Sequence, residues 1–431
     1  MRDFARSDHA GVQKQLDRLA ALSLPEGRLG LETVRALLDR LGNPHRALPP
    51  VFHVAGTNGK GSTCAFLRAM LEADGKRVHV ATSPHLVRYN ERIRLAGQLI
   101  EDDLLASLLA DVLDASDDLT PSFFEVTIAA TFLAFSCVPA DACVVEVGLG
   151  GRFDATNVLE PDVLAACGIA ALGIDHERFL LAPEEGVPTD AMARIAFEKA
   201  GIAKQGVPLV TLSYGTGETL EIERAAARNG SPLAMSERDW HVSRTGIGLL
   251  YADRHGELPL PHPALPGEYQ ADNAGLAIAL LRHQDTVRIS DDATASGLRT
   301  AKWPARLQAL GDGPLTGGRE VWLDGGHNAS AGAMLAQHFA GRRFHLVIGM
   351  IAAKDPQSIV GPLASLAASV TVVPVPGHDS HPVEAFGPEA RASTGLEAAL
   401  LHIADDDYPV LIAGSLYLAG EALRLNDEIP D

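Results

Sequence analysis

The alternation of short apolar runs with helical patterns is the feature that most constrains the fold of this 431-residue chain. The runs are rich in β-branched residues and lie at 51–56, 77–83, 142–148 and 162–170. Strands that alternate with helices predict a mainly parallel sheet covered by helices. A second series of the same kind starts near Trp303. We therefore expect an α/β fold with two domains, residues 1–298 and residues 299–431.

Turn signals between short alternating runs at residues 240–260 predict antiparallel strands added at one side of the first sheet. Helical periodicity predicts helices at residues 62–73, 121–135, 190–204, 272–283 and 330–340.

Charge and composition exclude several partner classes. The formal net charge of −19 argues against broad electrostatic binding to nucleic acid or to an anionic membrane. The four cysteines form no C-x-x-C pair and have apolar neighbours, which indicates buried free thiols in a reducing compartment. The N-terminal residues have no apolar signal core, and no run approaches membrane-span length. We expect a cytoplasmic protein without membrane or nucleic-acid partners.

The stretch VAGTNGKGST, residues 54–63, indicates an anion site. It departs from the common phosphate-loop pattern because position 54 is Val and Gly61 separates Lys60 from Ser62. A strand, a glycine-rich turn and a helix beginning at Ser62 would direct backbone N–H groups at one point, and Lys60 would add a charge. Ser62 or Thr63 could reach a phosphate-bound metal. The alternative is a turn capped by Ser62 with a solvated lysine.

Polar residues follow two further apolar runs. Glu146 lies inside the run Ala142–Val147, where a carboxylate is costly unless it is paired or lies at the carboxyl edge of a sheet. A carboxylate at such a strand end is typical of magnesium sites in phosphate-loop enzymes, although local hydrogen bonds could equally satisfy it. His176 follows the run 162–170 in the same way, and a lone histidine is more often structural.

Lys199 shares a helical face with Met192 and Ile195, at spacings of i, i+3 and i+7. The face is apolar, and a buried free ammonium is expensive. The lysine should be neutral, paired or chemically modified, unless it extends its head into water. In the second series, Arg306, Asp324 and His327 lie at segment starts or strand ends, where ligand residues gather.

Taken in order, these segments resemble the folylpolyglutamate synthase/dihydrofolate synthase family of the Mur ligase superfamily. The similar segments run over nearly the whole chain: HVAGTNGKGST (53–63), TSPHLVRYNERIR (82–94), SFFEVT (122–127), EVGLGGRFDATN (146–157), GIDH (173–176), EKAGIAK (198–204), DNAGLA (272–277), WPARLQ (303–308), LDGGHN (323–328) and GSLYLAG (414–420). The resemblance implies a phosphate-loop ATPase domain followed by a smaller C-terminal Rossmann-like α/β domain.

The resemblance also assigns expected roles. ATP contacts would come from Thr57, Asn58, Gly59, Lys60, Gly61, Ser62, Thr63, Asn273, Arg306, Asp324 and His327. Ligands of Mg²⁺ would be Ser62, Ser83, Glu146 and His176, and the catalytic set would be Lys60, Lys199, His176 and Glu146, with Lys199 carbamylated. The pterin contacts would be Arg28, Leu29, Gly30, Ser122, Phe123, Phe124, Glu125, Phe153, Asp154 and Ala155.

Two positions depart from the family pattern and one stretch has no counterpart. Ala305 stands where the family often has Gly, and Gly326 stands where it often has Ala. The stretch His378–Pro382 matches no family motif.

The expected reaction joins L-glutamate to dihydropteroate and to the glutamate tail of tetrahydrofolate derivatives, through an acyl phosphate formed from ATP. The protein is expected to be a monomer. Alternatives are folylpolyglutamate synthase activity alone, another Mur-type amide ligase, or a phosphate-loop kinase or nucleotide-regulated binding protein. About fifty residues precede the loop, fewer than the N-terminal substrate domain of other Mur-type ligases needs. A kinase would not account for the Lys199 helix or the second α/β series.

Overall fold

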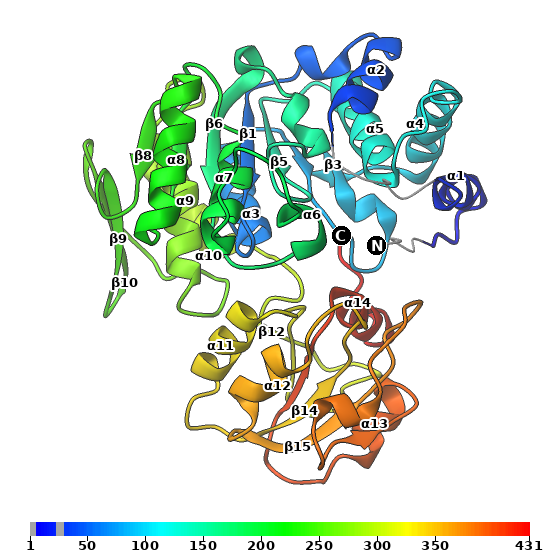
Figure 1. The fold of residues 1–431 in the computed structure, drawn as a ribbon. Helices are drawn as coiled ribbons and strands as arrows, with labels where there is room; N and C mark the ends of the chain where they lie inside the picture. Colours follow the sequence, from blue (N-terminus) through cyan, green and yellow to red (C-terminus); the bar gives the residue numbers. More distant parts are fainter. Residues whose placement is uncertain (1–5, 23–29) are drawn as a thin grey trace. The chain divides into compact units, whose positions relative to one another are not determined.

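The structure is a computed structural model that describes residues 6–22 and 30–431, and these fall into two compact units (Figure 1). The first unit holds the described residues up to Ser83, then Tyr89–Ala264 and Gln270–Lys302. The second unit holds Pro84–Arg88, Leu265–Tyr269 and Trp303–Asp431. The domain border between residues 298 and 299 stays a prediction, because contacts within one chain do not test which segments fold independently.

An eight-stranded sheet forms the centre of the first unit, in the order β4-β3-β2-β5-β1-β6-β7-β8. Its strands are β1 (Val51–Ala55), β2 (Val78–Ala81), β3 (Ile93–Leu95), β4 (Gln98–Leu99), β5 (Ala142–Glu146), β6 (Leu164–Ile169), β7 (Leu209–Thr211) and β8 (Leu233–Met235). All pairs from β2 to β8 are parallel, while β3 and β4 are antiparallel additions. Every residue of β1 and β5 is buried, as the apolar runs predicted.

Helices cover both faces of this sheet, as Figure 1 shows for α3 and α5. The helices are α1 (Ala10–Ala20), α2 (Glu32–Arg40), α3 (Lys60–Ala73), α4 (Asp102–Asp114), α5 (Phe123–Cys137), α6 (Glu177–Leu180), α7 (Ala191–Ala200), α8 (Thr216–Asn229), α9 (Gln270–Arg282) and α10 (Asp291–Thr300). Helix α3 begins at Lys60, two residues before the predicted start, because Gly59 takes a left-handed φ of 82° and its carbonyl already accepts the N–H of Thr63.

The segment at residues 240–260 is antiparallel as expected, but it forms its own three-stranded sheet. Its strands are β9 (Trp240–Thr245), β10 (Gly248–Asp253) and β11 (Gly256–Leu260), in the order β11-β10-β9. Helix α9 covers this sheet so closely that a Cβ on Gly275 would lie 2.7 Å from Val242 and 3.0 Å from Trp240. Two tight hairpins pair these strands with each other, so they do not extend the main sheet.

The second unit repeats the α/β alternation around a six-stranded sheet, in the order β12-β13-β17-β14-β15-β16. Its strands are β12 (Gln308–Ala309), β13 (Val321–Leu323), β14 (Phe344–Ile348), β15 (Ala367–Val372), β16 (Arg391–Ala392) and β17 (Val410–Ala413). Its helices are α11 (Ala329–His338), α12 (Gln357–Leu363), α13 (Leu396–His402) and α14 (Leu416–Leu425). Only the β12–β13 pair is antiparallel. The predicted second α/β series is therefore present.

Across the described residues, no helix is both long and apolar enough to cross a membrane.

Candidate active site

The glycine-rich loop between β1 and α3 is tied to the segment that follows β6. The N–H groups of Thr57 and Asn58 donate to the carbonyl oxygen of Ala171, at 2.8 and 3.1 Å. The Thr57 hydroxyl donates to the carbonyl oxygen of Gly173 at 2.8 Å. The first turn of a helix leaves its N–H groups without intrahelical acceptors. The N–H groups of Lys60, Gly61 and Ser62 are therefore those best placed to meet an anion.

Lys60, Glu146 and Ser83 lie together, although they come from three different parts of the sequence. The Nζ of Lys60 is 3.9 Å from Oε1 of Glu146, and the N–H of Ser83 donates to Oε2 of Glu146 at 3.2 Å. Each residue follows or ends one of three neighbouring parallel strands, namely β1, β5 and β2. Carboxyl ends of parallel strands meet at one edge of a sheet, and this edge is where α/β proteins bind ligands.

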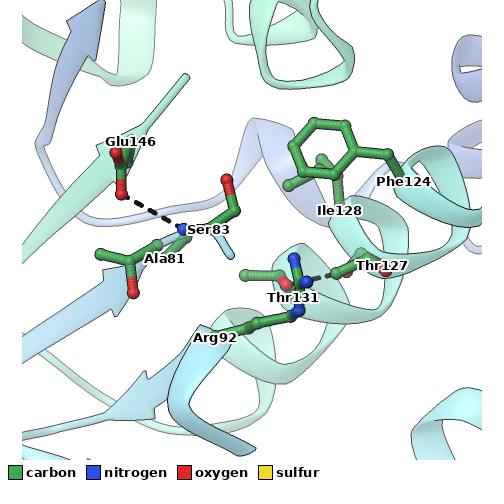
Figure 2. A pocket seen from close by; sticks show the side chains of 9 residues that line it. Ala81, Ser83, Arg92, Phe124, Thr127, Ile128, Thr131 and Glu146 are labelled. Carbon is green, nitrogen blue, oxygen red and sulfur yellow. Dashed lines mark hydrogen bonds between the residues drawn. The ribbon is translucent and has the colours of Figure 1, made fainter. Parts of the chain in front are cut away.

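A small pocket opens at this edge (Figure 2). Ser83 and Glu146 line one side of it, and Phe124 lies across from them. Thr82, Arg92, Thr127 and Thr131 are further polar residues of the lining, and sequence reasoning missed all four as site residues. Thr127 and Thr131 carried a signal, because they are polar residues four positions apart within a mostly apolar stretch of helix α5.

Lys199 is buried against the loop, with a relative exposure of 4%. Its Nζ donates to the carbonyl oxygen of Gly56 at 2.9 Å. Burial lowers the pKa of Lys199 to about 7, and the nearby charge of Lys60 acts in the same direction. Asp175 and Asp154 oppose this shift. The predicted core-facing position is confirmed, and the alternative in which its head extends into water is wrong.

Close backbone contact holds helix α7 against the turn after β5. The N–H of Arg152 donates to the carbonyl oxygen of Glu198 at 2.8 Å. A Cβ on Gly151 would lie 2.8 Å from that same oxygen, and a Cβ on Gly201 would lie 2.5 Å from the Cβ of Arg152. Small residues at both positions allow this approach, which places Lys199 beside the loop.

Asn273 lies against the loop, as its predicted nucleotide role requires. A Cβ on Gly59 would lie 2.3 Å from Oδ1 of Asn273. The Asn273 amide donates to Gln270 at 2.9 Å, and the Gln270 amide donates to the Ser62 hydroxyl at 3.3 Å. Gln270 is completely buried and was missed from the sequence. Its place three residues before Asn273, on the same helical face, was the available signal.

The predicted pterin residues fall into separate local structures. Ser122 and Glu125 form a capping box at the start of α5, so both side chains are engaged in helix capping. The ring of Phe123 packs edge-on against Tyr89, with 6.1 Å between centroids. Phe124 covers Gly148, where a Cβ would lie 2.3 Å from the ring.

The rest of the pterin set lies around the turn after β5 and near the N-terminus. Burial raises the pKa of Asp154, whose carboxylate accepts the N–H of Leu149 at 2.7 Å and the N–H of Thr156 at 3.0 Å. Ala155 is buried beside it. Phe153 lines a second, larger pocket. Gly30 precedes α2. Arg28 and Leu29 lie outside the described residues. The structure thus brings Phe124 into the same pocket as Glu146 and leaves the pterin roles as predictions.

His176 lies near the carboxyl edge of the main sheet because a residue close to it in sequence is bonded to the loop. Gly173, which is bonded to Thr57, precedes it by three residues, and His176 takes a left-handed φ of 53° before α6. Its N–H donates to Asp175 at 2.7 Å.

In the second unit, Asp324 organises the carboxyl end of β13. Its carboxylate accepts the N–H of Leu307 at 2.9 Å and the N–H of Gly326 at 2.7 Å. Burial raises the pKa of Asp324, while the charge of Arg306 opposes that shift. His327 contacts the carbonyl oxygen of Gly325 at 3.0 Å. The three predicted residues are therefore neighbours within this unit.

Both departures from the family pattern have a structural setting in the second unit. Ala305 takes a left-handed φ of 54°, a conformation that favours glycine. A Cβ on Gly326 would lie 2.6 Å from the Cβ of Ala331 and 2.7 Å from Oδ1 of Asp324. Alanine at position 326 would therefore need a shift of helix α11.

The candidate metal ligands near the loop fit a magnesium ion that is also held by phosphate and water better than they fit a metal held by protein side chains alone. No group of three or more His, Cys, Asp or Glu side chains that could hold a metal occurs among residues 6–22 and 30–431. Magnesium is commonly held by one or two carboxylates together with phosphate oxygens and water. Glu146 offers one buried carboxylate, and Ser62 and Ser83 offer hydroxyl groups close to the loop.

Solved structures share this architecture across their length. Escherichia coli FolC in complex with DHPP and ADP has a TM-score of 0.84 at 29% identity, covering 96% of this chain and 97% of that one. The bifunctional folylpolyglutamate synthase/dihydrofolate synthase of Yersinia pestis, complexed with AMPPNP and Mn ion, has a TM-score of 0.82 at 28% identity, with 96% and 97% covered. The fold and the loop site define an ATP-dependent ligase.

Curated relatives narrow this class to a family. The dihydrofolate synthase/folylpolyglutamate synthase of Bacillus subtilis is 34% identical over 361 residues, which are 79% of this chain and 80% of that protein. The probable bifunctional folylpolyglutamate synthase/dihydropteroate synthase of Haloferax volcanii is also 34% identical, but the chain covers only 48% of it. No protein-family model matches the chain. The chain belongs to the dihydrofolate synthase/folylpolyglutamate synthase family.

Proposed function

We propose that this protein ligates L-glutamate to dihydropteroate and to the glutamate tail of reduced folates, at the expense of ATP. The observation that carries the proposal is the convergence of Lys60, Glu146 and Lys199 on the loop at residues 56–62, in a chain whose relatives bear these activities in their names. ATP and a divalent cation are the cofactors, in line with the nucleotide and Mn complexes of its structural neighbours.

The reaction has two steps. An oxygen of the acceptor carboxylate attacks the γ-phosphorus of ATP, the bond from that phosphorus to the bridging oxygen breaks, and ADP leaves. The glutamate amine then attacks the carbonyl carbon of the acyl phosphate, loses a proton, and phosphate departs as the amide forms. Lys60 and the N–H groups of α3 neutralise the transferred phosphoryl group. Bound near Glu146, Ser62 and Ser83, Mg²⁺ would supply further neutralisation of phosphate charge.

Asn273, Arg306, Asp324 and His327 hold the nucleotide in this proposal, and His176 joins Glu146 near the metal. Lys199 acts in its carbamylated form, since a lysine with a pKa of about 7 has a large neutral fraction able to react with carbon dioxide. Phe124, in the same pocket as Glu146, contacts the pterin-bearing substrate. The protein acts as a monomer in the cytoplasm, with a domain border between residues 298 and 299.

The test measures ADP release with dihydropteroate and L-glutamate present together and with each omitted. We expect steady release only with both, and a loss of about a hundredfold or more in Lys60→Ala. The matched control is Lys14→Ala, which removes an exposed lysine of α1. Steady release without glutamate would instead indicate a kinase or a nucleotide-regulated binding protein.

Dual use of the site is tested with one preparation and two acceptors. Turnover of dihydropteroate and of tetrahydrofolate supports the bifunctional proposal. Turnover of tetrahydrofolate alone would leave folylpolyglutamate synthase activity only.

A further inference from the structure

A second pocket of about 450 Å³ in the first unit lies beside the residues of the proposed reaction. Its walls are the turn at residues 149–153, helix α6 with the loop that follows it, and helix α7. Glu198 lines the pocket, and the next residue, Lys199, is bonded to the loop carbonyl of Gly56. Arg178 also lines it, two residues after His176. The pocket therefore adjoins the reaction site along two separate segments.

Two of the arginines in this pocket are fully neutralised. Oε2 of Glu184 is 2.6 Å from Arg152 and 2.8 Å from Arg194. Oε1 of Glu198 is 2.8 Å from Arg152 and 3.0 Å from Arg194. Two cations thus share two carboxylates in a largely buried network, which ties the loop after α6 to α7. This ion-pair network forms a rigid part of the pocket wall. Its two positive and two negative charges cancel, so the network offers no net charge to a ligand.

Arg178 differs from these two arginines. Its side chain is exposed on the pocket wall and forms no ion pair with any described residue. The guanidinium lies 5.8 Å from the ring centroid of Phe179, and Phe153 also lines the pocket. An arginine fork beside aromatic rings is suited to a carboxylate carried on an apolar or aryl group. Glu185 also lines the pocket, and its negative charge would oppose an anion.

We propose that this pocket binds the α-carboxylates of the γ-glutamyl tail of folate acceptors, with Arg178 as the cation that selects for them. The inference rests on the proposed function. Dihydropteroate carries a single carboxylate, the reacting one, whereas a glutamylated folate carries one further α-carboxylate for each glutamate, a few bonds behind the reacting γ-carboxyl. In a protein of net charge −19, these extra anions need a local cation close to the reaction site.

The experiment measures equilibrium binding of dihydropteroate and of tetrahydrofolate with one and three glutamates, without ATP, in the whole protein. For each tetrahydrofolate ligand we compare its Kd with the Kd of dihydropteroate. In Arg178→Gln we expect this ratio, Kd for tetrahydrofolate divided by Kd for dihydropteroate, to rise about tenfold. Arg178→Lys, which keeps the charge but not the fork, should give a smaller rise. Glu185→Gln should change the ratio in the opposite direction, by about twofold.

The matched control is Arg228→Gln. Arg228 is also exposed, forms no ion pair within the described residues and lies 5.5 Å from the ring of Phe197, but it is outside the pocket. Its loss should leave the ratio unchanged. An unchanged ratio in Arg178→Gln, with both acceptors still bound, would overturn this inference and leave the proposed function standing. A wild-type protein that ligates glutamate to neither acceptor would overturn the proposed function itself.

Discussion

The Nζ of Lys199 donates to the carbonyl oxygen of Gly56 at 2.9 Å, so a buried lysine of α7 is held against the first residue of the phosphate-binding loop. This contact leaves Lys199 close to Lys60, whose charge helps to lower its pKa. A lysine that is easily deprotonated next to a phosphate site is suited to carbamylation, which would replace a second cation with a carboxylate.

Lys199→Ala should therefore lose activity by more than about a hundredfold and recover in part with added short-chain carboxylates. Protein equilibrated with ¹³C-labelled carbon dioxide should show a carbamate resonance in ¹³C NMR spectra that is absent from this variant. Full activity of the unrescued variant would rule out an essential role for the lysine.

The depressed pKa of Lys199 also predicts how stability depends on pH. Burial lowers the pKa from 10.5 to about 7, so between these values the unfolded chain binds more protons than the folded protein. The free energy of unfolding should therefore rise as the pH is raised from 7 towards 10, and this contribution is lost as the pH falls through 7. In Lys199→Met the rise should be smaller. Urea unfolding at pH 7, 8 and 9 in carbonate-free buffer measures this free energy. If it depends on pH in the same way in both proteins, the lowered pKa of Lys199 is contradicted.

Glu146→Gln tests the buried carboxylate at the end of β5. The amide keeps the shape and can still accept the N–H of Ser83, but it removes the charge that faces Lys60 and that would face the proposed Mg²⁺. We expect kcat to fall about a hundredfold and the Mg²⁺ concentration for half-maximal activity to rise. Glu257→Gln, at an exposed position of β11, is the control. An unchanged Mg²⁺ requirement would exclude Glu146 from the metal site.

Gly59→Ala and Gly75→Ala form a matched pair at the two ends of α3. Both glycines have left-handed φ values, 82° and 77°, but a Cβ would meet Asn273 at 2.3 Å only at position 59 and has open space at position 75. Each variant should lose about 1 kcal/mol to backbone strain. Gly59→Ala should in addition weaken ATP binding by about tenfold or more, measured by calorimetry. Equal ATP affinity in the two variants would show that Asn273 does not shape the loop.

Ala305 offers a test in the second unit. A left-handed φ of 54° costs an alanine about 1–2 kcal/mol, which glycine would recover. The substitution would also remove the buried methyl group of Ala305, whose burial contributes about 0.8 kcal/mol to stability. Ala305→Gly should thus change stability by less than about 1 kcal/mol, whereas Ala305→Val should cost more than about 2 kcal/mol. Thermal unfolding of both variants measures this, and a stable valine variant would contradict the backbone conformation.

Several site residues were predictable from the sequence because their signals are local. Glu146 interrupts an apolar strand, and Lys199 lies on the apolar face of a helix, so burial of both followed from periodicity alone. Gln270 and Arg92 were missed for the opposite reason. Gln270 matters because it meets Ser62, 208 positions away, and Arg92 matters because it lines the same pocket as Glu146. No pattern of neighbouring residues encodes such a meeting.

The sequence by itself determined the alternation of strands and helices, the anion-binding loop and the order of motifs that indicates an ATP-dependent ligase. Only the tertiary structure decided that the head of Lys199 is bonded to Gly56 rather than to water, that Ala305 occupies a conformation suited to glycine, and that Glu184 and Glu198 neutralise Arg152 and Arg194 while Arg178 is left exposed. The physical reason is the distance along the chain over which each effect acts. Propensity and periodicity act over one or two turns of chain, whereas burial, pairing and charge depend on segments that meet only in the folded protein.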